Sequence, residues 1–130
     1  MHALRNIHAA LVPDGVLVDT QPVSAAPLVA GHGTALGTLD MREWLQTIRS
    51  IDELVAETIA AGLYEPVHEQ RFAVTDTFDD GAKCLDNLST FRGTRVPVAL
   101  ERRIRAARGL VTVTQDVRLR LLRRSATRSD

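Results

Sequence analysis

The apolar residues of this chain recur at two spacings, and each spacing predicts a different kind of secondary structure. Apolar positions three and four residues apart predict helices over 2–12 and 51–62, because side chains at that spacing share one face of a helix. Short apolar runs and strict alternation predict strands, because successive strand side chains point to opposite faces of a sheet. The strands are predicted over 15–19, 67–76 and 110–122.

The helix over 51–62 carries signals at both of its ends. Ser50 stands at the N-cap position with Glu53 three residues later, a capping box that satisfies two free amide groups of the first turn. Gly62 follows the last apolar position and suits the left-handed conformation that ends many helices. The apolar stripe of this helix consists of Ile51, Leu54, Val55, Thr58 and Ile59.

The strand over 110–122 shows the most regular alternation in the sequence. Alternation of this kind predicts one apolar face and one polar face. The apolar set is Val111, Val113, Val117, Leu119 and Leu121, which is interrupted only by Gln115. The polar set is Thr112, Thr114, Asp116, Arg118 and Arg120.

Residues 20–38 are rich in Pro, Gly, Ala and Ser and show neither spacing. They fit a hairpin over 28–39 with Gly31, His32 and Gly33 at its tip. They fit an ordered loop equally well, and both interpretations remain open.

Residues 79–108 predict a pair of helices. Asp79 and Asp80 open the first helix, where acids complement the helix dipole, and Gly93 ends it. Its apolar face consists of Phe78, Leu85, Leu88 and Phe91. Pro97 stands at the first position of the second helix, which Gly109 ends. The apolar members of the second helix are Val98, Leu100, Ile104 and Ala107.

The composition is that of one globular domain over 1–130, with 45% apolar and 25% charged residues. Strands mixed with helices then predict an α/β fold. No apolar run is long enough to cross a membrane, and the N-terminal segment lacks the layout of a signal peptide, so we expect a cytoplasmic location and no membrane contact. The single cysteine, Cys84, excludes an internal disulfide framework and fits a small core residue better than a nucleophile.

The formal net charge is zero, but the two signs lie in different parts of the chain. Residues 1–91 carry thirteen acids and five bases, whereas residues 92–130 carry three acids and eleven bases. Such asymmetry indicates either contact with nucleic acid or neutralisation within one fold. We expect internal pairing, in which strand arginines meet acids across the sheet. The acids considered as partners are Glu69, Asp76, Asp79 and Asp80.

Two runs in the chain resemble segments of class I S-adenosylmethionine-dependent methyltransferases. The first run, Ala3 to Val18, reads Ala-Leu-Arg-Asn-Ile-His-Ala-Ala-Leu-Val-Pro-Asp-Gly-Val-Leu-Val. It is similar to the family's helix and Pro-Asp-Gly turn that lead into the fifth strand of a Rossmann-like sheet. The second run, Ser50 to Leu63, is similar to the next helix and ends in Ala-Gly-Leu. Strands 67–76 and 110–122 are similar in position to the family's antiparallel sixth and seventh strands.

The resemblance implies a partial, Rossmann-like methyltransferase half-fold to which the helical pair is added. In this layout strand 110–122 lies between strands 15–19 and 67–76. The family binds S-adenosylmethionine with a glycine-rich loop after its first strand and an acid after its second, and this chain has neither segment. The glycines around His32 lack the strand–loop–helix context that a cofactor loop requires. We therefore expect no cofactor bound by this chain alone, and methyl transfer only if an N-terminal half is supplied.

The resemblance also implies that substrate contacts come from the region after strand 15–19. The candidates there are Asp19, Gln21 and His32. Two plainer interpretations stand beside this one: Asp19 caps the following turn, and His32 is a solvated loop histidine. The four histidines lack the spacing of metal ligands, so no metal site is expected.

A second set of candidates is basic. Arg102, Arg105 and Arg108 recur on one predicted helix and form a potential phosphate-binding face. No aromatic residue follows Phe91, so side chains that would stack on bases are missing from this region. A small nucleic-acid-binding protein is therefore a less favoured alternative to the methyltransferase-like half-domain, as is a non-catalytic interaction protein.

The edge of strand 15–19 predicts a partner. In the family's complete fold this strand pairs with a fourth strand, which this chain lacks, so the edge is expected to be unpaired and apolar. We expect a homodimer joined through this edge, or a complementing N-terminal half. The alternative is that the hairpin over 28–39 folds back and covers it.

Overall fold

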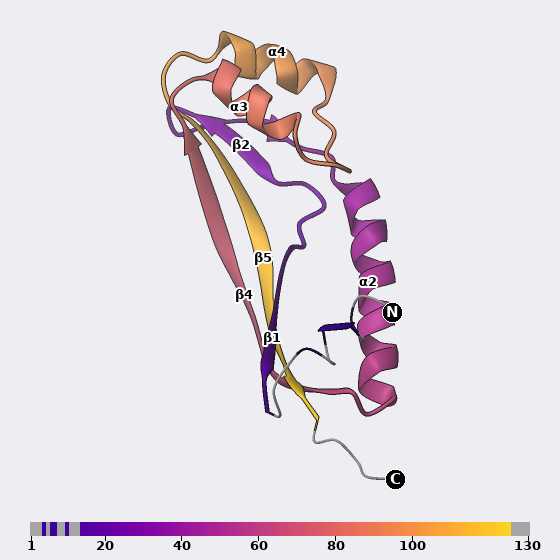
Figure 1. Cartoon of the computed structure of the whole chain (residues 1–130). Coiled ribbons are helices and arrows are strands. Elements are labelled where there is room, and N and C mark those ends of the chain that lie inside the picture. The colour runs from indigo at the N-terminus through magenta and orange to yellow at the C-terminus, as the bar shows by residue number, and fades with distance from the viewer. Residues whose placement is uncertain (1–3, 5, 8–9, 11–13, 126–130) are drawn as a thin grey trace. The chain divides into compact units, whose positions relative to one another are not determined.

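The structure is a computed structural model, and it describes residues 4, 6–7, 10 and 14–125. The elements labelled in Figure 1 follow in the order β1 Val16–Pro22, β2 Leu28–Gly31, β3 Thr34–Thr38, α2 Arg42–Ala60, β4 Tyr64–Phe78, α3 Gly81–Leu88, α4 Val98–Ala106 and β5 Val111–Arg124. The expected mixture of helices and strands is confirmed. The helix predicted over 2–12 falls largely outside the described residues. Within the described ranges, no helix combines the length and apolarity needed to cross a membrane.

Strand β5 is the centre of strand pairing in the described part of the chain. Its neighbours are β1, β2 and β4, and β3 adds to the outer side of β2. The Arg124 amide donates to the Gly15 carbonyl, and the Val23 amide donates to the Asp116 carbonyl. Residue numbers therefore rise along β1 while they fall along β5, which makes these two strands antiparallel.

Strand β4 is also antiparallel to β5. The Ser125 amide donates to the Leu63 carbonyl, and the Thr75 and Thr114 hydroxyl oxygens lie 3.0 Å apart. Strands β1 and β4 are consequently parallel to each other on opposite edges of β5, and α2 connects them in sequence. Strand β5 thus pairs with both β1 and β4 in a five-stranded sheet, and these three strands are somewhat longer than predicted.

The described residues pack into two compact units. The first unit takes in the described residues of 1–21, 48–71 and 118–130, and the second takes in 22–47 and 72–117. Helix α2 and strands β4 and β5 contribute residues to both units. Each unit has an apolar cluster of its own.

The first unit is built on the contact between α2 and its three strands. Val55, Tyr64 and Leu122 are almost fully buried, and Leu17 of β1 packs against them. The phenolic hydroxyl of Tyr64 donates a hydrogen bond to the Leu4 carbonyl oxygen at 2.7 Å. The buried stripe predicted for this helix is therefore confirmed at its centre.

The start of α2 differs from the prediction. The helix begins at Arg42, not at Ile51, because the Asp40 carboxylate accepts the Arg42 amide at 3.1 Å and Ile48 extends the buried stripe by a turn. Ser50 consequently lies inside the helix, and the capping box predicted there was wrong. Gly62 follows the helix with a φ of 77°, in the left-handed conformation that was expected.

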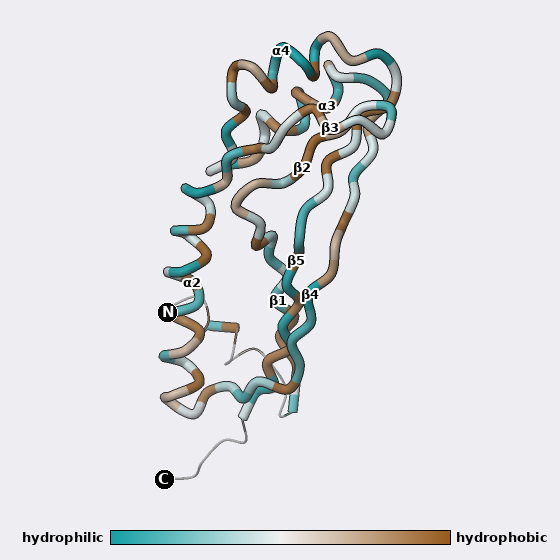
Figure 2. The backbone as a smooth tube through the Cα atoms, turned by 180° about the vertical axis from the view of Figure 1, so that it is seen from behind, coloured by the Kyte–Doolittle hydropathy of each residue, from teal (hydrophilic) through white to brown (hydrophobic). Residues whose placement is uncertain are grey.

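Strand β5 follows the predicted alternation only in its first half, and Figure 2 colours this strand by hydropathy. Val111, Val113 and Val117 are buried as predicted. In the second half Arg118 is only 6% exposed, whereas Leu119 and Leu121 keep partial exposure. The prediction was wrong here because α2 covers the face that holds the even-numbered residues.

The second unit contains the hairpin of β2 and β3. The two strands are antiparallel, and their turn places His32 and Gly33 at positive φ values of 52° and 74°. Leu28 of β2 lies opposite Thr114 of β5, so the hairpin extends the sheet beside β5. The hairpin interpretation of this segment is confirmed, and its strands pair with each other and with β5.

Helices α3 and α4 complete the second unit. The Asp80 side chain accepts the Lys83 amide at 2.9 Å and caps α3, as the acids before it suggested. Helix α3 ends at Leu88, earlier than predicted, so Phe91 lies in the connection and is 55% exposed. Pro97 is the N-cap residue of α4, so the helix begins at Val98, one residue later than predicted. The core of this unit consists of Val29, Leu39, Cys84, Leu88, Leu100, Ile104, Val111 and Val113.

A mutation at the contact of α3 with α4 tests the packing of this core. A Cβ atom added at Gly81 would overlap the Ile104 carbonyl oxygen, which is backbone and cannot turn aside. We expect Gly81→Ala to lower the free energy of unfolding by about 2 kcal/mol, the usual cost of overpacking. Urea denaturation measures this change. Ala82→Ser at the exposed neighbouring position is the control, and equal midpoints for the two variants would contradict the packing described.

Candidate functional site

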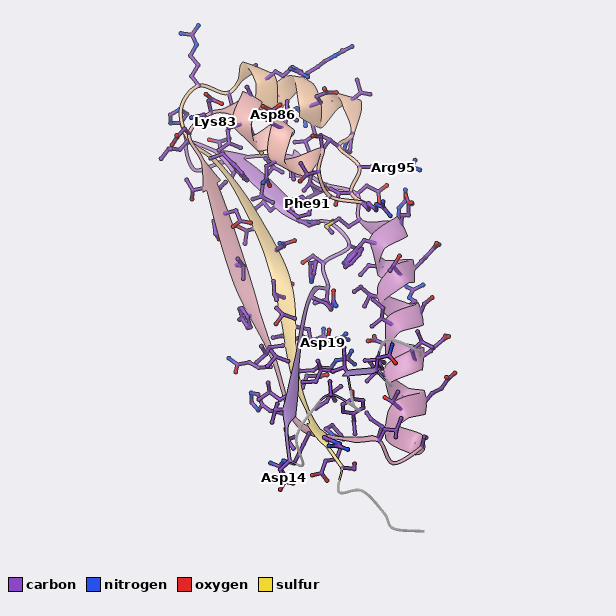
Figure 3. The ribbon with its side chains drawn as sticks, in the orientation of Figure 1. Asp14, Asp19, Lys83, Asp86, Phe91 and Arg95 are labelled. Carbon is purple, nitrogen blue, oxygen red and sulfur yellow. The ribbon has the colours of Figure 1, made fainter. Side chains whose placement is uncertain are left out.

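Asp19 lies in the middle of β1 and faces a charged environment (Figure 3). The Arg120 Nε and Nη2 atoms donate to Asp19 Oδ2 at 3.0 and 2.7 Å. Gln21 Nε2 donates to Asp19 Oδ1 at 3.0 Å, so the structure brings these two substrate candidates together. Asp19 does not cap a following turn, because β1 continues to Pro22. That interpretation was wrong.

Asp52 of α2 joins the same group of charges. Arg118 donates to it through Nη1 at 3.1 Å and Nη2 at 2.8 Å, and Arg120 Nη2 lies 3.1 Å from its Oδ1. We call Asp19, Arg120, Asp52 and Arg118 the ion-pair network. It carries two negative and two positive charges, so a buried guanidinium is matched by carboxylates, as desolvation requires.

The ion-pair network shifts the pKa values of Asp52 and Arg118. Burial alone raises the pKa of Asp52, but hydrogen bonds and positive charge from Arg118 and Arg120 outweigh it, so the pKa of Asp52 lies below its ordinary value. The hydrogen bond from Asp52 raises the pKa of Arg118. The Arg118 Nε atom is buried and has no hydrogen-bond partner among the described residues. The network is therefore a tightly held part of the first unit.

Sequence reasoning missed Asp52, although one signal was present. Residues 48, 52, 55 and 59 share a helical face, and the other three members of that set are apolar. An acid on the apolar stripe of a helix needs a cation from the facing element. The arginines of the last strand are the cations that meet this need.

His32 belongs to the second unit, whereas Asp19 and Gln21 belong to the first. Its ring contacts the Arg108 carbonyl oxygen through Nε2, and the ring remains exposed. The turn that holds His32 is followed by β3 and not by a helix. Gly31 and Gly33 therefore do not form the strand–loop–helix cradle of a dinucleotide-type cofactor, and these residues do not fit S-adenosylmethionine.

The basic face expected on one helix is only partly a helical surface. Arg102 and Arg105 lie on α4, but the helix ends at Ala106, so Arg108 follows it. All three side chains are exposed. Arg105 pairs with Glu101 at 2.9 Å, which reduces the positive charge that a phosphate would meet.

A shallow polar pocket of about 540 Å³ opens in the second unit at the start of α2. Its lining residues are Asp40, Arg42, Glu43, Gln46 and Arg95, the last of which is labelled in Figure 3. The side-chain hydrogen bond from Arg42 holds the pKa of Asp40 at about 2. The two acids and two bases balance, so the pocket has no net charge with which to select an ion. The sequence patterns gave no sign of it.

Part of the charge asymmetry of the chain is neutralised internally, by ion pairs between the last strand and the acidic part of the chain. Three arginines of β5 pair with acids from the earlier part of the chain. Their partners are Asp19, Asp52 and Glu65, which are not the four acids named from the sequence. The neutralising acids come from β1, α2 and β4, the elements that surround β5 in the first unit.

Comparison with known proteins adds no assignment. No family model matches the chain, and no curated protein matches it.

Removal of Asp52 tests the ion-pair network. Asp52→Ala leaves the buried Arg118 guanidinium without its carboxylate, and we expect a loss of about 2 kcal/mol in the free energy of unfolding. Asp52→Ala combined with Arg118→Met should recover much of that loss, because two apolar side chains need no partner. Urea denaturation at neutral pH measures both. Asp79→Ala, which breaks the exposed pair with Lys83, is the control, and a loss in this variant equal to that of Asp52→Ala would count against the network.

The lowered pKa of Asp52 also predicts the acid response. The folded state binds fewer protons at Asp52 than the unfolded chain does. The ion pair of Asp52 with Arg118 therefore stabilises the folded state fully at pH values above about 3.9, the pKa of aspartate in the unfolded chain. This stabilisation is lost as the pH falls through the lower folded pKa. The wild-type urea midpoint should therefore fall more steeply below about pH 4 than that of Asp52→Asn. Parallel curves for the two proteins would show that Asp52 is not linked to folding.

Proposed function

We propose that this chain is the C-terminal half of a class I S-adenosylmethionine-dependent methyltransferase fold and that it does not transfer methyl groups by itself. One observation carries the proposal. Strands β1 and β4 are parallel, β5 lies antiparallel between them, and α2 connects them in sequence (Figure 1). The fifth, seventh and sixth strands have this order and these directions in the family that the sequence resembles.

The exposure of side chains on β1 supports the proposal that the sheet is incomplete. Parallel strands joined by a helix are normally covered on both faces and continued at their edges. In the first unit α2 covers one face, while Val16 and Val18 are 44% and 58% exposed. A second α/β half would supply both a strand for the edge and a layer for this face.

The residues of this chain indicate which role it would have in the complete fold and which role a complementing half would have. The hairpin tip around His32 does not fit the cofactor, so a complementing half would hold S-adenosylmethionine. This chain would contribute the sheet and the substrate candidates. Gln21 is the candidate with an adaptable amide, and Asp19 positions it, because the Asp19 carboxylate accepts hydrogen bonds from both Gln21 and Arg120. His32 is the third candidate of the proposal.

Calorimetric titration with S-adenosylmethionine tests the proposal in two steps. The isolated chain should give no binding heat at micromolar concentrations. The reading frame upstream of the Met1 codon, or a neighbouring gene, should encode a glycine-rich strand–loop–helix, and coexpression of that segment with this chain should give micromolar binding. Micromolar binding by the isolated chain would contradict this assignment of roles. Absence of binding by the coexpressed pair would contradict the methyltransferase assignment.

A further inference from the structure

The described strands have three outer edges, and two of them are protected. The edge of β3 lies under α4, where Arg103 Nη1 donates to the Leu36 carbonyl at 2.9 Å. The edge strand β4 carries Pro66, which has no amide hydrogen, together with the charged residues Glu65, Glu69 and Arg71. A covering helix, proline and charge are the devices by which proteins keep sheet edges from pairing.

Among the described residues, the outward edge of β1 has no covering helix and no charged residue, and its one proline stands at the end of the strand. The Gly15 carbonyl and the Val23 amide bond to β5, so the backbone groups of odd-numbered residues face β5 and those of even-numbered residues face outward. The outward residues are Val16, Val18 and Thr20, which are uncharged, and Pro22 ends the series. The one charge between them, on Asp19, is neutralised by Arg120.

The exposed side chains of the same residues belong to an apolar row. By the register of the three strands, Val18 lies opposite Leu121, and Leu121 lies opposite Val67. Val18 is 58% exposed and Val67 is 39% exposed. In the second unit, the face of the sheet that its helices leave uncovered carries the polar residues Thr75, Thr112 and Thr114. The row in the first unit is composed differently, because its side chains Val18, Leu121 and Val67 are apolar.

We propose that β1 pairs antiparallel with β1 of a second copy of this chain, about a two-fold axis at Val18. In this register Val18 lies opposite its own copy, and Val16 lies opposite Thr20 of the second copy. All three outward residues take part, which gives about six backbone hydrogen bonds. Pro22 falls just beyond the paired segment, where its missing amide costs nothing.

A second copy fits this edge better than a charged or helical partner. The outward residues are β-branched, and β-branched residues directly opposite each other stabilise strand pairing. The two-fold axis places no like charges opposite one another. It also aligns the apolar rows of both copies, so that Val18 is flanked by Leu121 on one side and by its own copy on the other.

Self-pairing does not rest on the proposed function, but it bears on it. A strand from a complementing half would need the same edge of β1, so the two partners exclude each other. The dimer is then the state of the chain without that half. Failure to bind S-adenosylmethionine in any combination would leave the dimer intact.

Sedimentation velocity of the whole chain, from low to high micromolar concentration, tests the proposal. The wild type should convert from monomer to dimer as the concentration rises. Val18→Lys puts two like charges opposite each other and should raise the dimer dissociation constant by about tenfold or more. Thr75→Lys, at an exposed strand position in the second unit, is the matched control and should dimerise as the wild type does. Circular dichroism and urea midpoints establish that both variants fold.

A cysteine variant tests the register itself. Directly opposite residues of paired strands have Cα atoms within the range that a disulfide spans, so Val18→Cys should form a disulfide-linked dimer under mild oxidation. Thr75→Cys should not, and native Cys84 is buried and does not compete. A wild type that stays monomeric at every concentration would overturn the proposal. A dimer that Val18→Lys leaves unchanged, or that Val18→Cys does not link, would do the same.

Discussion

The pairing of β5 with three other strands is the constraint on which the rest of the structure depends. Strand β5 is the last element of the described chain, yet β1, β2 and β4 all pair with it. Its first half supplies Val111 and Val113 to the core of the second unit, and its second half supplies Leu122 to the core of the first. Pairing between segments so distant in sequence predicts slow formation of this sheet.

The register of β5 in the first unit is set by charge as well as by apolar packing. Arg118, Arg120 and Leu122 face α2, and a slip by one residue would turn them to the open side and bring Leu119 and Leu121 inward. Only the observed register gives the two arginines their carboxylates. The ion-pair network therefore selects one register of the strand.

The sequence was sufficient for the elements that depend on local patterns. The three main strands and the cap at Asp80 follow from spacing and capping chemistry. The hairpin was one of two open interpretations, and the order of the strands came only from the resemblance to a known family. It was insufficient where a distant segment changed the meaning of a local signal. The Asp40 carboxylate starts α2 at Arg42, nine positions before the predicted start at Ile51, and α2 in turn makes the arginine face of β5 the buried one. Asp52 could not be recognised as a site residue until its partners were known.

The edge of β1 that is unpaired among the described residues is the feature on which both proposals depend. Amide hydrogen exchange along this strand, followed by NMR at several protein concentrations, measures it directly. The amides of Leu17, Asp19 and Gln21 face β5 and should exchange slowly at every concentration. Those of Val16, Val18 and Thr20 should exchange rapidly in dilute protein and slowly in concentrated protein. Rapid exchange of these three amides at all concentrations would contradict a pairing edge at β1.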